Sequence, residues 1–170
     1  MLAMFLLPSC SQPPPAETES SRQPTLARLK LQAEQGESAA QSQLGLTYLN
    51  GEGVPQDYAE SVRWFRAAAE QGDQRAQVNL GYMYRDGLGI PQDPAEAVRW
   101  YRMAAEQGHA SAQNALGVMY QSGYGVLQDI REAVRWYRMA AEQDHVDAQI
   151  QLGFMYDLGQ GVPQDPAEAV

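Results

Sequence analysis

A period of 36 residues runs through most of this 170-residue chain and restricts the folds open to it. Three residue types mark it at constant spacing: Trp64, Trp100 and Trp136; Gly45, Gly81, Gly117 and Gly153; and Tyr48, Tyr84, Tyr120 and Tyr156. The run AVRWYRMAAEQ occurs twice unchanged, beginning at Ala97 and at Ala133. Short units that cannot bury an apolar face alone stack on their neighbours, so the period predicts a repeat protein.

The period also predicts how the chain is divided. The expected parts are a degenerate half-repeat at 26–36, three repeats at 37–72, 73–108 and 109–144, and an incomplete fourth repeat at 145–170. The half-repeat is assigned from its ending AEQG, at Ala33 to Gly36, which returns at the ends of the first two repeats. We expect the folded region to begin with this half-repeat.

Each repeat is predicted to form two helices, which we call its first and second helix. In the second repeat, Ala76, Leu80 and Tyr84 lie four residues apart and define the buried face of the first helix. Glycines follow at the position where a helix commonly ends. The second helix begins at the sequence DPAE, which resembles a capping box with Asp93 as N-cap and Glu96 as its partner.

Apolar and small residues line the predicted contact between the helices. Gly81 in the first helix, with Ala104 and Ala105 in the second, allows the helix axes to approach to about 8 Å. Trp100 and Tyr101 would fill the space between them. No segment alternates as a strand does, so the predicted fold is an all-α solenoid of stacked helix pairs.

The motif of the repeat resembles that of a known family. The pattern A-Q-x-x-L-G-x-x-Y, then G-x-G-V-P-Q-D, then A-x-x-W-Y/F-x-x-A-A-E-Q-G is similar to the Sel-one-like repeat (SLR), a relative of the tetratricopeptide repeat. This resemblance implies a right-handed α/α superhelix that acts as a scaffold or adaptor for other proteins. Three positions depart from the pattern: Leu127 replaces a proline, Arg131 an alanine and Asp144 a glycine. We expect Asp144 to weaken the end of its helix, since a side chain disfavours positive φ.

The charge balance argues against one class of partner. Lys and Arg total 12 and Asp and Glu total 21, for a formal net charge of −9, which disfavours binding to a phosphate backbone. Arginines recur in pairs along the second helices: Arg63 and Arg66, Arg99 and Arg102, Arg135 and Arg138. These arginines could bind an anionic partner, but the favoured interpretation is that they form ion pairs with glutamates three residues earlier in the chain. No nucleic-acid partner is therefore predicted.

A different kind of sequence precedes the repeats. Residues 1–10 form an apolar, signal-like segment that ends at Cys10, with Leu7 and Ser9 placed as in a bacterial lipoprotein box. Residues 11–25, rich in Ser, Pro, Gln and Glu, would form a flexible tether. The prediction is a chain of the bacterial cell envelope, periplasmic or anchored by a lipid on Cys10, rather than a cytoplasmic one. The alternative is an unmodified cysteine.

Few residues suited to catalysis are present. The sequence has one cysteine and two histidines, His109 and His145, and it lacks the serine motifs of common hydrolases. The histidines occupy equivalent positions one repeat apart, too far to share a metal ion. We expect no enzyme activity, cofactor or metal. The alternative is an envelope hydrolase or β-lactam-directed enzyme, since the resemblance extends to cysteine-rich proteins linked with β-lactam hydrolysis.

The resemblance implies that partners dock in a concave groove lined by the first helices. Candidate partner-binding residues, on the side away from the predicted buried face, are Gln43, Asn79, Met83, Asp86, Met119, Gln151 and Met155. The recurring methionines have an alternative interpretation as core between the helices. Terminal repeats need a polar cap, so we expect the apolar face of Leu152 and Tyr156 to be covered. The cover would be a downstream segment, a partner or a second copy, the last through self-association of the incomplete fourth repeat.

Overall fold

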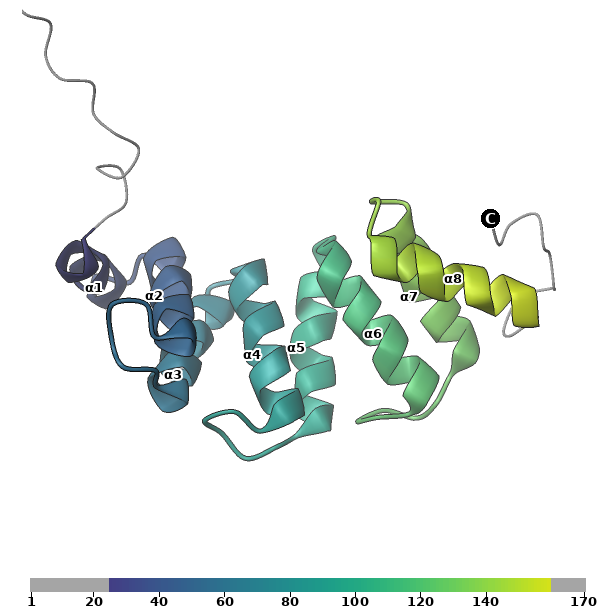
Figure 1. The fold of residues 1–170 in the computed structure, drawn as a ribbon, viewed down its shortest axis with the longest axis horizontal. Helices are drawn as coiled ribbons and strands as arrows, with labels where there is room; N and C mark the ends of the chain where they lie inside the picture. The colour runs from purple at the N-terminus through teal and green to yellow at the C-terminus, as the bar shows by residue number, and fades with distance from the viewer. Residues whose placement is uncertain (1–24, 160–170) are drawn as a thin grey trace, which may run out of the picture.

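Within residues 25–159, eight α-helices follow one another in chain order along an elongated solenoid (Figure 1). The computed structural model describes residues 25–159, which contain no β-strand. The helices are α1 (Leu26–Glu34), α2 (Ser38–Asn50), α3 (Tyr58–Glu70), α4 (Gln74–Asp86), α5 (Pro94–Glu106), α6 (Ala110–Ser122), α7 (Ile130–Ala141) and α8 (Val146–Leu158). Helix α1 is the second helix of the half-repeat, and α2, α4, α6 and α8 are the first helices of the four repeats. The signal-like segment with Cys10, most of the tether and residues 160–170 lie outside the described residues.

Aspartate side chains start the second helices, as the DPAE motif predicts. The Asp93 carboxylate accepts hydrogen bonds from the backbone N–H groups of Ala95 at 3.1 Å and Glu96 at 3.0 Å. Asp57 and Asp129 cap α3 and α7 in the same way. The reciprocal half of the capping box is not formed. The N–H of Asp93 instead donates to the carbonyl of Tyr84, and Glu96 pairs with Arg99.

Residues with left-handed backbone, at positive φ, follow the helices, and at one of these positions the residue is not a glycine. Helix α4 ends at Gly87 with φ of 71°, where a glycine has no side chain to strain. Asp144 is the one non-glycine residue with positive φ among the described residues, at 61°. Helix α7, just before it, has 12 residues, whereas α3 and α5 have 13. The shorter helix agrees with the expected weakening at Asp144.

A glycine under an aromatic ring joins the two helices of each complete repeat. A Cβ added to Gly81 on α4 would lie 2.7 Å from Tyr101 Cε1 on α5, closer than atoms can approach. Gly45 under Phe65 and Gly117 under Tyr137 repeat this contact. The helices can approach this closely only because the glycine has no side chain. The recurrence of this glycine every 36 residues predicted the close contact.

The apolar core is continuous from repeat to repeat. Trp136 of the third repeat shares a buried cluster with Tyr101 and Leu116, whose helices belong to two different repeats. Trp100 in turn packs with Phe65 and Leu80. Each tryptophan therefore joins its own repeat to the one before it, so the repeats form one packed body.

A ladder of glutamines runs through the same interior. The Gln77 Nε2 donates to the carbonyl of Ala69 at 3.2 Å, and its Oε1 accepts from Gln107 Nε2 at 2.8 Å. Gln41 with Gln71, and Gln113 with Gln143, form the same bonds one period before and after. The ladder ties α3, α4 and α5 together with satisfied buried polar groups, which fixes their relative position.

Candidate protein-binding surface

The first helices lie side by side and form one layer of the solenoid. Val78 on α4 packs into the cluster that contains Ala115 and Met119 of α6. Leu46 and Leu49 on α2 pack likewise into the cluster that contains Met83 of α4. Each first helix therefore has a side that faces the preceding repeat and a side that faces the next. The surface between these two sides is open for a partner.

The methionine candidates do not lie on that open surface. Met83, Met119 and Met155 are at most 2% exposed and pack in the apolar clusters between helices. Their assignment to partner binding was wrong, and their alternative interpretation as core is correct. The prediction assumed one covering helix, but α4 packs against α2, α3 and α5. These three neighbours bury a wider part of its surface, which includes Met83.

The polar candidates are accessible to differing degrees. Gln43 and Asp86 are exposed, whereas Asn79 and Gln151 are half-buried. Asn79 Nδ2 donates to the carbonyl of Arg75 on its own helix at 3.0 Å. The Arg85 guanidinium donates two hydrogen bonds to the Asp86 carboxylate, at 2.7 and 2.9 Å, and lowers the pKa of that group. Asp86 therefore presents a neutralised ion pair rather than a free negative charge.

An apolar row on the first helices was missed from the sequence. Tyr82, Val118 and Phe154 occupy one register position of α4, α6 and α8 and are 38%, 44% and 57% exposed. Leu46 occupies the same position on α2 and is half-buried. The signal was the recurrence of large apolar residues at this register, which lies outside the face defined by Ala76, Leu80 and Tyr84. We call Tyr82, Val118 and Phe154 the apolar row.

A hollow of about 560 Å³ lies at the N-terminal end of the layer. We call it the N-terminal hollow. Leu26, Leu29 and Gln32 of α1 line one side, and Ala39, Ala40, Gln43 and Thr47 of α2 line the other, with Glu37 and Glu52 at its edge. Its lining includes one predicted partner-binding residue, Gln43.

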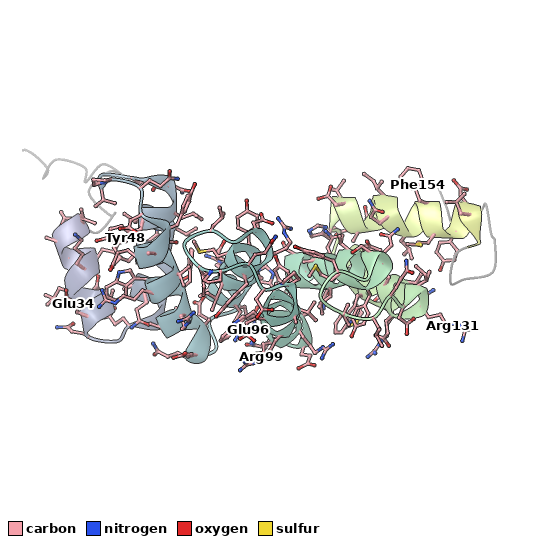
Figure 2. The ribbon with its side chains drawn as sticks, turned by 90° about the horizontal axis from the view of Figure 1, so that it is seen from below. Glu34, Tyr48, Glu96, Arg99, Arg131 and Phe154 are labelled. Carbon is pink, nitrogen blue, oxygen red and sulfur yellow. The ribbon has the colours of Figure 1, made fainter. Side chains whose placement is uncertain are left out.

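The arginines of the second helices are already partnered. Arg63, Arg99 and Arg135 lie 3.2, 2.9 and 3.3 Å from the glutamates three residues earlier and over the rings of Trp64, Trp100 and Trp136. Figure 2 shows Glu96 and Arg99 side by side on α5. Arg66, Arg102 and Arg138 donate to the hydroxyls of Tyr84, Tyr120 and Tyr156. The favoured interpretation, pairing within the chain, is confirmed for the first set.

The two histidines start helices. His145 Nδ1 accepts from the N–H of Ala148 at 3.4 Å, whereas His109 Nδ1 is buried without a hydrogen-bond partner in the structure. Burial, with the nearby Arg75 guanidinium, lowers the pKa of His109. Within residues 25–159, no three His, Cys, Asp or Glu side chains come together as metal ligands. No helix in that range is both long and apolar enough to span a membrane.

Comparison with known sequences and structures gives consistent matches. The sequence model described as Sel1 repeat matches residues 38–73, 74–109, 110–145 and 146–170. No curated protein matches the chain.

Solved structures extend the match to three dimensions. A protective antigen present in uropathogenic Escherichia coli strains, c5321, which displays an SLR fold, is 45% identical over 86% of this chain with a TM-score of 0.84. A Sel1 repeat protein from Oxalobacter formigenes is 41% identical over 85% of the chain, with a TM-score of 0.79. The chain spans 32% of the first structure and 59% of the second.

A more distant structure shares the fold alone. Helicobacter pylori cysteine rich protein B is 21% identical over 73% of this chain and 95% of its own, with a TM-score of 0.58. The helix-pair architecture is therefore common to all three structures.

Proposed function

The chain belongs to the Sel1 repeat family, whose members are typically scaffolds for protein interaction, and we propose that its own partner docks on the first-helix layer. The observation that carries this proposal is the apolar row, Tyr82, Val118 and Phe154, exposed at one register on three helices. Large apolar side chains held at regular spacing on a surface are typical of protein-binding sites.

The rigidity of the layer supports the same function. Gln77 and Gln107 link three helices through hydrogen bonds, and Gly81 packs closely against the ring of Tyr101. A partner that meets a surface ordered in advance loses less conformational entropy on binding. The side chains around the row supply polar contacts: Gln43 and Asp86 are exposed, and Asn79 and Gln151 are partly so. These four remain the predicted polar contacts of the partner.

Binding by a doubly substituted chain tests the proposal. The full chain and Tyr82→Ser/Val118→Ser would serve as baits in extracts of bacterial envelopes, and each recovered protein would be titrated in purified form. We expect saturable binding that weakens at least about tenfold in the variant, as loss of two exposed anchors predicts.

The matched control is Ala59→Ser/Ala95→Ser, which changes two exposed residues on second helices. Circular dichroism would show that both variants keep the fold. Partners that bind the Tyr82→Ser/Val118→Ser chain as tightly as the native chain would contradict docking on the apolar row.

The proposal extends to location. The chain acts in a bacterial cell envelope, held by a lipid on Cys10, with residues 11–25 as the tether. Support comes from the apolar run that leads to Leu7-Pro8-Ser9-Cys10 and from the bacterial sources of the similar structures. In a bacterial host, alkyne-palmitate should label the native chain and Ser9→Ala but not Cys10→Ser. An unlabelled native chain in the soluble fraction would contradict it.

Self-association is the last part of the proposal. The face predicted from Leu152 and Tyr156 is packed within the chain, since Tyr156 is buried and Leu152 packs against the cluster of Met155. Four other apolar side chains one turn apart on α8, Val146, Ile150, Phe154 and Leu158, are 65%, 50%, 57% and 65% exposed. We call these four residues the α8 face. A continuous apolar face of this kind favours a covering protein surface over water. A second copy of the chain is a partner that is always present.

No observation on the described residues favours the hydrolase alternative. His109 and His145 each start a helix, and neither lies in a cluster of three metal-binding side chains within residues 25–159.

A further inference from the structure

The repeats themselves show what covers the side of a first helix that faces the next repeat. Val78 on α4 packs into the cluster that contains Ala115 and Met119 on α6. Ile150 on α8 occupies the register of Val78, two repeats later, yet it is half exposed. Phe154, on the outer side of α8 (Figure 2), occupies the register of Tyr82 and Val118, which stay exposed although a repeat follows each of them, so it lies outside this contact. Ile150 of the α8 face is thus on the side to which a further first helix would bind.

The opposite end of the solenoid carries the complementary side. Gln43 and Thr47 on α2 occupy the registers of Ala115 and Met119, which share a cluster with Val78. Together with Leu26 and Leu29 of α1 they line the N-terminal hollow. The hollow therefore lies where a first helix ahead of α1 would pack, against a second helix on one side and a first helix on the other.

The geometry points to a head-to-tail contact in which α8 of one copy fills the N-terminal hollow of a second copy. This inference rests on the proposed self-association and names the surface that receives the α8 face. In that register Ile150 lies beside Gln43 and Thr47 of the second copy. The chain thereby uses the same contact between copies that it uses between its own repeats.

Two features of α1 and α8 fit the same pairing. Leu29 on α1 occupies the register of Phe65, the ring that covers Gly45, so in the docked pair Leu29 would cover Gly153 of the other copy. Gln149 donates to the carbonyl of Ala141, as the other ladder glutamines do to theirs. Gln35, at the register of Gln71, would donate to Gln149 Oε1 across the contact.

This contact joins two different surfaces, so it is heterologous and leaves one surface of each kind free at the ends. Copies can therefore add one after another, and the mean mass should rise with concentration rather than stop at a dimer. An α8 face that bound a second α8 face would instead form a closed dimer of fixed mass.

Sedimentation of the full chain and two variants tests the inference. Ile150→Asp puts a charge on the docking side of α8, and Ala39→Glu/Gln43→Glu puts two charges in the hollow. The control, Ala59→Glu/Ala95→Glu, adds the same charge at exposed positions on α3 and α5. Circular dichroism and thermal unfolding would verify the fold of each chain.

We expect the native chain and the control to form species that grow with concentration, and each variant alone to stay monomeric. An equal mixture of the two variants should form a dimer and nothing larger, because one intact surface of each kind remains. A hollow variant that still forms dimers would overturn the hollow as the receiving site while leaving self-association in place. A native chain that stays monomeric up to about millimolar concentration, where a contact with a Kd of 1 mM would show, overturns both.

Discussion

At the scale of single residues, the contact of Gly81 with Tyr101 sets the distance between α4 and α5. The ring occupies the space that a Cβ on Gly81 would take. Glycine inside a helix ordinarily costs stability relative to alanine, by roughly 0.5–1 kcal/mol. Here the close packing of the ring outweighs that cost, which explains the glycine at this position of each complete repeat.

Gly81→Ala should destabilise the native chain but not a chain in which the ring is shortened. The new Cβ would meet Tyr101 at 2.7 Å, and overpacking of this kind costs about 1–3 kcal/mol, more than the helix gains. In a Tyr101→Leu background the same change should be neutral or stabilising by up to about 1 kcal/mol. Urea unfolding of the four chains measures both effects. Equal losses in the two backgrounds would show that the ring is not the cause.

His109 should make stability depend on pH. Its pKa lies below the usual 6.5 because burial and Arg75 disfavour the charged ring. The folded chain therefore binds its proton less readily than the unfolded chain does. The stabilisation is complete above 6.5 and is lost as pH falls from there through the folded pKa.

Titration of the His109 ring by NMR measures that pKa, and urea unfolding at several pH values between 7.5 and 5.5 measures the stability. His109→Asn, a good N-cap that does not titrate, should lose less stability over this interval. An equal loss in the variant would assign the effect to other groups.

At the scale of single helices, local bonds decide where each element begins. The carboxylates of Asp57, Asp93 and Asp129 each satisfy two backbone N–H groups that the helix itself leaves free. The glutamates three residues later serve the outer surface instead. Glu60 illustrates this, since it accepts from Arg63 and from Trp64 Nε1.

Asp93→Ala should therefore lower stability by about 1 kcal/mol, because Ala95 and Glu96 lose their acceptor. Glu96→Ala should cost less, about 0.5 kcal/mol, since it removes an exposed ion pair with Arg99 rather than a cap. Thermal unfolding of both variants compares the two roles. A larger loss for Glu96→Ala would restore the capping-box interpretation.

At the scale of the whole molecule, each internal helix of the solenoid packs against neighbours on both sides, whereas the helices at the two ends pack on one side only. Helix α1 packs chiefly on α2, and α8 chiefly on α7, whereas α4 contacts α2, α3 and α5. In a stack of this kind, stability is a sum of local terms and contacts between neighbours. The central repeats should be the most stable part of the chain.

Hydrogen exchange of the native chain should reflect this order. Amides of α1 and α8 should exchange at least about tenfold faster than those of α4 to α6, since they open without breaking two interfaces. At a concentration where the α8 face is covered by a second copy, exchange in α8 should slow. Uniform protection across all helices would show that the array unfolds as a single unit.

The fold was predictable because its determinants are local and repeated. Asp93 and Gly87 act through bonds within a few residues, and the spacing of Gly81 and Tyr101 is the same in each complete repeat. The surface was less predictable. A face drawn from Ala76, Leu80 and Tyr84 assumes one covering neighbour, so it placed Met83 outside and overlooked Tyr82.

The sequence by itself determined the helices, their ends and the 36-residue unit, because hydrogen bonds and apolar periodicity within one unit are sufficient for these. Only the tertiary structure decided which residues are buried between repeats. Met83 is buried in the core, Tyr82 is exposed, and Gln77 accepts a hydrogen bond from Gln107 just after α5. The reason is geometric: each first helix contacts neighbours on several sides, and the angles between helices, which no local pattern encodes, select the strip left open for a partner.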